Sequence, residues 1–129
     1  MGIMIPVMFQ LRHHGKVINL QGMQITAKDA LALSAGLSYM EKCEGIDLSH
    51  NPIFDAGCVN SESLRCCGIV NAIALNTCIK TVILSRTRIS RVTASTLGRF
   101  LPYHGTITRL DLSNNDLRDE GIEALASGL

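Results

Sequence analysis

A short aliphatic alternation that recurs along the chain constrains its fold more than any other feature. Its last occurrence begins the segment 107–129, where Leu110 and Leu112 alternate and Asn115 follows them. Alternate residues of a strand point to one face, so the two leucines face the same way. Further along, Ile122, Leu125 and Leu129 are spaced by three and four, which is typical of one helix face. The segment therefore predicts a strand, a sharp turn and a returning helix.

The pattern occurs four times, at intervals of 28, 36 and 28 residues, with centres at Ile18, Ile46, Val82 and Leu110. One such unit cannot bury its own apolar face, and units of this kind become stable by stacking on similar neighbours. The longer interval predicts about eight extra residues, and we expect them within 58–67. The same offsets before the first centre predict a partial repeat or cap at residues 1–14.

The apolar spacing predicts strands at about 16–20, 45–48, 81–84 and 109–112. It predicts helices at about 27–39, 62–75, 91–101 and from about 119 onward, and N-caps for the first three at Thr26, Ser61 and Ser90. Parallel strands joined by helical crossovers are expected to be right-handed. The predicted fold is an α/β right-handed solenoid of about four repeats, with a parallel sheet on the concave side and helices on the convex side. We read residues 1–129 as a single domain, and because both ends fall within a repeat we expect a fragment of a longer solenoid.

The 28-residue period and the phrase DLSNNDLRDEGIEALASGL resemble the ribonuclease-inhibitor-like subfamily of leucine-rich repeats. The resemblance covers roughly residues 15–129 and is most specific in the last repeat. It departs at Met23 and Thr87, which replace Asn, and at Gly15 and Cys43, which replace the first Leu. The resemblance implies binding of partner proteins, as in enzyme inhibitors, GTPase regulators, innate receptors and ciliary or cytoskeletal assemblies. The loop residues with which GTPase-activating members act are not matched here.

Composition indicates which partners and which cellular compartment to expect. The formal net charge is +1, so bulk charge does not favour nucleic acid or an anionic membrane as a partner. The apolar run at residues 3–9 is too short to cross a bilayer and has no basic residues before it. The cysteine count of five is odd, and Cys43 and Cys58 fall on core positions, which is typical of a reduced, intracellular protein. We expect a cytoplasmic protein, including a cytoskeletal or ciliary one.

A catalytic site and a metal site are alternatives to a purely protein-binding function. No serine, cysteine or histidine lies in a nucleophile-elbow, P-loop, HExxH or dinucleotide-binding pattern. Asp47 and Asp111 lie two repeats apart, too far to share acid–base chemistry. A zinc site would need paired cysteines, but no CxxC is present and Cys66 and Cys67 are adjacent. We therefore expect no enzyme activity, no catalytic residue, no metal and no cofactor.

The candidate site is the outward face of the strands. Its central column is predicted to be Asn19, Asp47, Ile83 and Asp111. The full set of predicted partner-binding residues is Asn19, Gln21, Asp47, Ser49, Ile83, Ser85, Arg109, Asp111 and Ser113. The leading hypothesis is a protein-interaction scaffold, and a solvated face with no partner, or contact through the helices or the extra residues, remain alternatives. Further alternatives are a regulator or inhibitor of a partner enzyme or GTPase, and a structural subunit whose ends stack on further repeats or neighbouring subunits.

Overall fold

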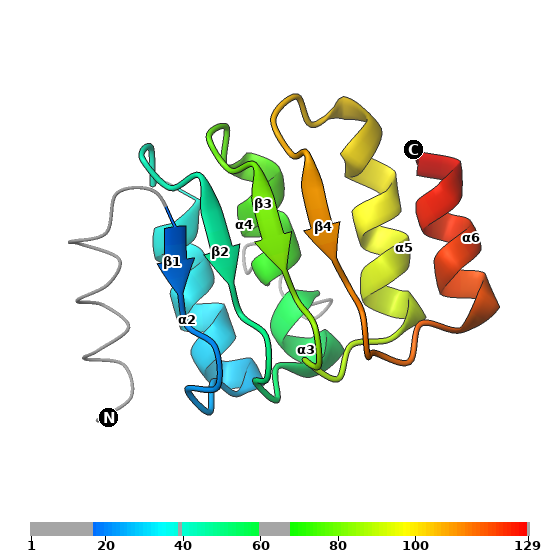
Figure 1. The fold of residues 1–129 in the computed structure, drawn as a ribbon, viewed down its shortest axis with the longest axis horizontal. Helices are drawn as coiled ribbons and strands as arrows, with labels where there is room; N and C mark the ends of the chain where they lie inside the picture. Colours follow the sequence, from blue (N-terminus) through cyan, green and yellow to red (C-terminus); the bar gives the residue numbers. More distant parts are fainter. Residues whose placement is uncertain (1–16, 39, 60–67, 129) are drawn as a thin grey trace.

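A computed structural model describes residues 17–38, 40–59 and 68–128. Within these ranges four strands form one sheet, namely β1 (Val17–Asn19), β2 (Gly45–Asp47), β3 (Thr81–Ile83) and β4 (Arg109–Asp111). The strands are parallel and lie in chain order, as Figure 1 shows. Each is a residue or two shorter than the spacing predicts, but all four lie inside the predicted ranges.

The register places the four predicted centres on adjacent rungs. Ile18 pairs with Ile46, Ile46 with Val82, and Val82 with Leu110. The first three are at most 1% exposed, while Leu110 is half-buried because β4 is at an edge of the sheet among the described residues. The predicted α/β class and parallel sheet are therefore confirmed, and the stacked aliphatic rungs form the core.

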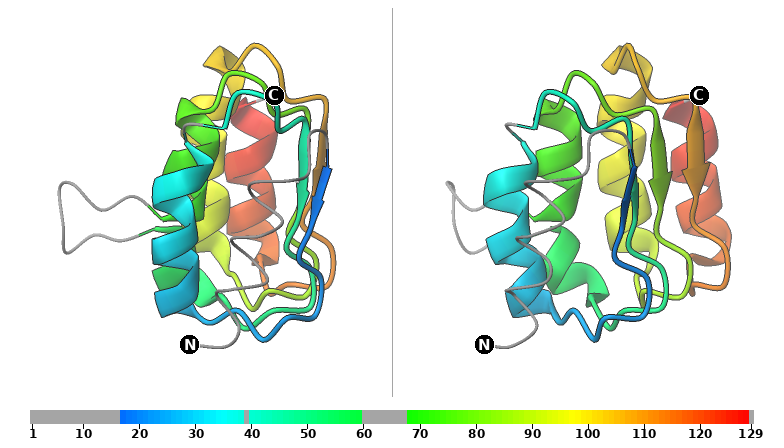
Figure 2. Two further views of the ribbon diagram at one scale, coloured as in Figure 1. Left: turned by 90° about the vertical axis from the view of Figure 1, so that its left-hand side faces the viewer. Right: turned by 60° about the vertical axis from the view of Figure 1, so that its left-hand side comes forward.

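The helices cover one face of this sheet (Figures 1 and 2). They are α2 (Ala27–Leu37), α3 (Phe54–Cys58), α4 (Ile69–Leu75), α5 (Arg91–Phe100), the 3-10 turn η1 (Leu101–Tyr103) and α6 (Arg118–Gly128). Thr26 caps α2 in a capping box with Asp29, and Ser90 caps α5 through the amide of Val92. Two of the predicted caps are therefore confirmed. In the described ranges no helix is long and apolar enough to cross a membrane.

The second helix differs from the prediction of one helix over 62–75. Residue Gly68 is extended, α4 begins only at Ile69, and a short α3 forms where a loop was expected. A Cβ added to Gly68 would lie 2.1 Å from the Cys58 oxygen, so the chain returns to the point where α3 ends. The extra residues therefore interrupt the helix in the middle instead of preceding it. The predicted cap Ser61 and residues 62–67 lie outside the described residues.

The turns after the strands follow two alternating patterns. Four residues beyond each strand centre the backbone is left-handed, at Gly22, His50, Arg86 and Asn114. A second left-handed residue follows at Gln24 and Arg88 in the first and third repeats, but at Phe54 and Arg118 in the second and fourth. In the first and third repeats, where the second left-handed residue comes earlier, Met23 or Thr87 replaces Asn. The sequence departures therefore mark a different turn geometry within one stacked sheet.

Candidate protein-binding surface

The sheet face opposite the helices carries the predicted central column. Asn19 is beside Asp47, Asp47 beside Ile83, and Ile83 beside Asp111 in the strand register. Neighbouring strands are about 4.8 Å apart, so the two aspartates are separated by about 10 Å with an isoleucine between them. No described element covers this face in Figure 2. The structure thus places these four side chains in one row on an open surface.

Hydrogen bonds at the strand ends hold the polar members of the column. Asp47 Oδ1 accepts from the Ser49 amide at 3.0 Å and hydroxyl at 2.6 Å. Asp111 Oδ1 accepts from the Ser113 amide at 2.9 Å and hydroxyl at 2.7 Å. These bonds from Ser113 hold the pKa of Asp111 below its usual range. The Asp111 carboxylate is therefore ionised at neutral pH, and the hydrogen bonds orient both carboxylates before any partner arrives.

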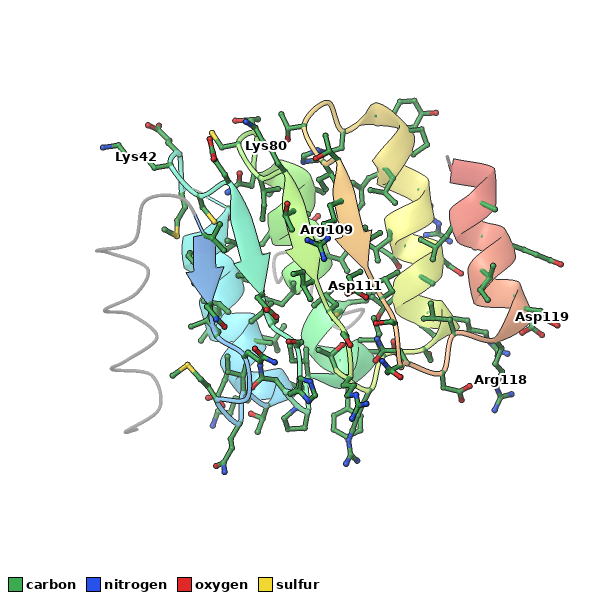
Figure 3. The ribbon with its side chains drawn as sticks, in the orientation of Figure 1. Lys42, Lys80, Arg109, Asp111, Arg118 and Asp119 are labelled. Carbon is green, nitrogen blue, oxygen red and sulfur yellow. The ribbon has the colours of Figure 1, made fainter. Side chains whose placement is uncertain are left out.

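The other predicted residues have unequal access to solvent. Gln21, Arg109 and Ser113 are exposed, while Ser85 is half-buried and its hydroxyl oxygen lies 3.2 Å from that of Ser113. Ser49 is only 4% exposed, so it orients Asp47 and is not itself a contact surface. Arg109 and Asp111 lie on β4, as Figure 3 shows. The face therefore combines two carboxylates, a central aliphatic side chain and a guanidinium at one end.

Asparagine side chains join neighbouring repeats where the strands end. Asn51 Nδ2 donates to the Leu20 carbonyl at 2.9 Å, and its Oδ1 accepts from the Ile25 amide at 3.0 Å. Asn115 Nδ2 makes the equivalent bond to the Leu84 carbonyl at 2.8 Å. Each amide thus satisfies main-chain groups of its own turn and of the preceding turn.

This repeated geometry is also found in known proteins. Residues 105–126 match the family model described as Leucine Rich repeat. They form a leucine-rich repeat. A solved structure of leiomodin-1 actin-binding site 2 is similar, with a TM-score of 0.75 and 14% identity over 96% of this chain and 70% of that chain. Curated protein sequences contain no match to this chain.

These comparisons identify a leucine-rich repeat at residues 105–126 and a fold shared with the leiomodin structure over most of the chain. The family model matches the last repeat, and the low identity to the leiomodin structure shows a shared fold alone. The ribonuclease-inhibitor-like subfamily and the right-handed sense of the solenoid stay predictions.

A second set of bridges lies where the helices end, and the sequence analysis missed it. Asn76 Nδ2 donates to the Leu37 carbonyl at 2.8 Å, and His104 Nε2 lies 3.0 Å from the Ile73 carbonyl. A carbonyl can only accept, so Nε2 is the protonated ring nitrogen of His104. Asn76 and His104 each precede a strand centre by six residues, and this common spacing was the signal available in the sequence. The two different side chains perform the same task in consecutive repeats.

Asp55 joins the second repeat to the third. Its carboxylate accepts from the Ser90 amide at 2.9 Å, from the Ser90 hydroxyl at 2.6 Å and from the Thr93 hydroxyl at 2.6 Å. Partial burial favours a higher pKa for Asp55, but the bonds from Ser90 and Thr93 outweigh it and hold the pKa below its usual range. The junction of the second and third repeats is therefore held by Asp55 as well as by His104.

Metal and thiol chemistry have little support in the described residues. No group of three or more His, Cys, Asp or Glu side chains in the described part of the chain could hold a metal ion. Cys43 and Cys58 are buried core thiols, as the sequence predicts. Burial raises the pKa of Cys58 to about 12, which leaves its thiol protonated and unreactive at neutral pH. Cys66 and Cys67 lie outside the described residues.

Proposed function

We propose that the chain is a non-catalytic protein-interaction scaffold that binds a partner protein on the open sheet face. The observation that carries this proposal is the register that aligns Asn19, Asp47, Ile83 and Asp111 across four strands. Such a row presents side chains at fixed spacing on a packed framework. A rigid surface loses little conformational entropy on binding, which favours recognition.

The chemistry of the row favours a particular kind of partner segment. Asp47 and Asp111 offer two carboxylates about 10 Å apart, and half-buried Ile83 lies between them. A partner segment with an apolar side chain between two cationic ones would match this order. At the β4 end of the row, the guanidinium of Arg109 would bind a carboxylate of the partner. The proposed contacts are Asn19, Gln21, Asp47, Ile83, Ser85, Arg109, Asp111 and Ser113, with Ser49 in support.

The leiomodin structure supports a protein partner, because it is an actin-binding site built on a similar fold. We place this chain in the cytoplasm, in a cytoskeletal or ciliary setting, with neither nucleic acid nor membrane as its partner. A partner enzyme or GTPase would be held by the same face. Monomeric and filamentous actin are the first two candidates to test.

The test removes charge from the column without changing its geometry. Asp47→Asn with Asp111→Asn keeps the strand-end acceptor, because Asn19 Oδ1 already accepts from the Gln21 amide at 3.1 Å in the first repeat. Partner capture, with actin filaments and monomers as separate arms, should weaken at least about fivefold for this double variant. The matched control is Glu41→Gln with Glu123→Gln, which removes two exposed carboxylates elsewhere. Equal binding by the wild type and the column variant would contradict the sheet-face proposal.

A second candidate is a structural subunit that stacks on another strand–helix unit at the outer edge of β4. Leu110, Leu112 and Leu125 are half-buried there and line a hollow of about 390 Å³. Asp119 is exposed in α6 (Figure 3), 64 residues after Asp55 and at the same repeat position. It could therefore accept from a neighbouring unit as Asp55 does. Leu125→Glu should abolish such stacking and leave the column-dependent binding intact, so sedimentation velocity of both variants separates the two candidates.

A further inference from the structure

A polar groove lies along the turns where the strands end. It has a volume of about 770 Å³, and its lining includes His50, Arg86, Arg88, Ser90 and Asp116. The groove crosses the second, third and fourth repeats and lies apart from the column on the sheet face. Neither the family match nor the leiomodin likeness assigns a role to these residues.

The charge of the groove is concentrated in the third repeat. Arg86 and Arg88 are exposed, and among the described residues neither guanidinium has a carboxylate within 4.0 Å. The nearby carboxylates are already engaged: Asp55 accepts from Ser90 and Thr93, and Asp116 lies 3.5 Å from Arg118. The same positions in the first repeat hold Gly22 and Gln24, which are uncharged. The groove therefore presents two arginines whose charge is not neutralised within the described structure.

Both arginines share an unusual backbone conformation, and a ring contact positions the side chain of Arg88. Both residues are left-handed, with φ of 53° at Arg86 and 60° at Arg88. Such a conformation is sparsely populated by non-glycine residues and persists only when the surroundings impose it. The Arg88 guanidinium carbon lies 5.6 Å from the centre of the Phe54 ring, within reach of a cation–π interaction. The N-terminal end of α5 at Ser90 adds a partial positive charge to the same groove.

We propose that this groove binds an acidic linear segment of a partner protein, with carboxylates on Arg86 and Arg88. Guanidinium groups suit planar, bidentate contacts with carboxylates. The inference rests on the proposed scaffold function and adds a second contact of opposite charge. An acidic peptide fits this groove better than nucleic acid does. Arg88 lies over the Phe54 ring, on which a nucleic-acid base would otherwise stack. In addition, Asp116 lines the groove and the net charge of the chain is only +1.

The repeats themselves supply the test substitutions. Asn114 holds the position of Arg86 in the next repeat with φ of 59°, and Gln24 holds the position of Arg88 in the first repeat with φ of 58°. Arg86→Asn with Arg88→Gln therefore removes both charges and keeps residue types that this turn already accepts. The control is Lys42→Gln with Arg99→Gln, which removes two exposed charges elsewhere. Figure 3 shows Lys42 in the loop before β2, at the end of the molecule where the strands begin, and Arg118 near the opposite end.

The experiment titrates the full chain into a labelled hexaglutamate peptide and follows fluorescence anisotropy. We expect binding that weakens as salt rises from about 50 to about 300 mM, since the contacts are exposed and screened. The arginine double variant should bind at least about fivefold more weakly, and the Lys42/Arg99 control should stay within about twofold of the wild type.

Three results would overturn the groove proposal. They are no binding of hexaglutamate, equal loss in the arginine variant and the control, and tighter binding of an oligo-dT strand, which would point to nucleic acid. Asp47→Asn with Asp111→Asn should leave hexaglutamate binding unchanged. A failure here would therefore remove the groove while leaving the sheet-face proposal to its own test.

Discussion

At the scale of single residues, polar side chains connect one turn to the next. Asn51 and Asn115 do so where the strands end, and Asn76 and His104 where the helices end. Each bonds to main-chain groups of the preceding turn, and the Leu20 carbonyl is the one of the four carbonyls bridged in this way that receives no second donor within the described residues. Leaving such a group unsatisfied costs about 1–3 kcal/mol. These side chains therefore determine which main-chain groups of neighbouring turns meet, and the aliphatic side chains of the core alone do not do so.

Depth of burial predicts how much the two strand-end amides contribute. Asn51 is 1% exposed and Asn115 is half-buried. Asn51→Ala should lower the free energy of unfolding by about 3 kcal/mol and Asn115→Ala by about half as much, because water reaches the second site. Urea unfolding followed by circular dichroism measures both. Equal losses, or a loss below about 0.5 kcal/mol at Asn51, would contradict this account.

Asp55 should make part of the stability depend on pH. Its pKa is held below the unfolded value of about 3.9, so its contribution is present above that pH and is lost as pH falls through the folded pKa. Asp55→Asn should cost about 1 kcal/mol at pH 7, a value reduced by partial exposure to solvent.

The measurement is urea unfolding of wild type and variant between about pH 7 and pH 2. The difference in unfolding free energy should shrink as the solution becomes acidic. Glu123→Gln, which changes an exposed carboxylate, is the control and should change the free energy of unfolding at pH 7 by less than about 0.5 kcal/mol. A difference that stays constant over the whole range would refute the role given to Asp55.

At the scale of elements, the second repeat accommodates its extra length within a helix. Helices α3 and α4 together occupy the place that one helix fills in the other repeats, and the chain leaves at Cys58 and returns at Gly68. The two chain segments are so close that a side chain at Gly68 would meet main-chain atoms of Cys58. The described chain therefore leaves the stack at Cys58 and re-enters it beside the same point at Gly68.

The contact at Gly68 predicts a large effect of one methyl group. A Cβ there would lie 2.1 Å from the Cys58 oxygen, so Gly68→Ala should lower the free energy of unfolding by at least about 2 kcal/mol. Gly105→Ala is the control, because no atom lies within 4 Å of its added Cβ. The control should change stability by less than about 0.5 kcal/mol. Equal effects in thermal or urea unfolding would show that the close approach is absent.

Removing the extra residues should leave the stack intact. Deletion of residues 60–67 would return the interval between Ile46 and Val82 from 36 to 28 residues. Because the entropy of closing a loop depends weakly on its length, the free energy of unfolding should change by less than about 1 kcal/mol. Calorimetry should still show one cooperative transition. Loss of that transition would mean that residues 60–67 are required for the fold.

Sequence spacing predicted the strands and the outward column, because aliphatic alternation directly determines which side chains face the core. Ile83 and Asp47 could be assigned to the open face for that reason. The break at Gly68 could not be predicted, since it depends on a contact with Cys58. Asp55 was also missed, because its acceptor role depends on Ser90, 35 residues away. Such partners become visible only once the stack is formed.

At the scale of the whole molecule, a net charge of +1 conceals two surfaces of opposite character. The sheet face carries Asp47 and Asp111 around Ile83, while the groove along the turns carries Arg86 and Arg88. Both surfaces exist because the strands are in register, which repeats each position at fixed spacing. Both proposed binding surfaces therefore require the four units to be stacked in register.

Stacking is tested most directly by NMR couplings transmitted through hydrogen bonds in the full chain. Three amides should couple to carbonyl carbons of the next strand: Leu20 to Asp47, Leu48 to Ile83 and Leu84 to Asp111, whose N–O distances are 2.8, 2.9 and 2.8 Å. We predict all three couplings in one long-range experiment that correlates amide nitrogens with carbonyl carbons. Assigned amides that couple to other acceptors, or to none, would contradict the four-rung sheet.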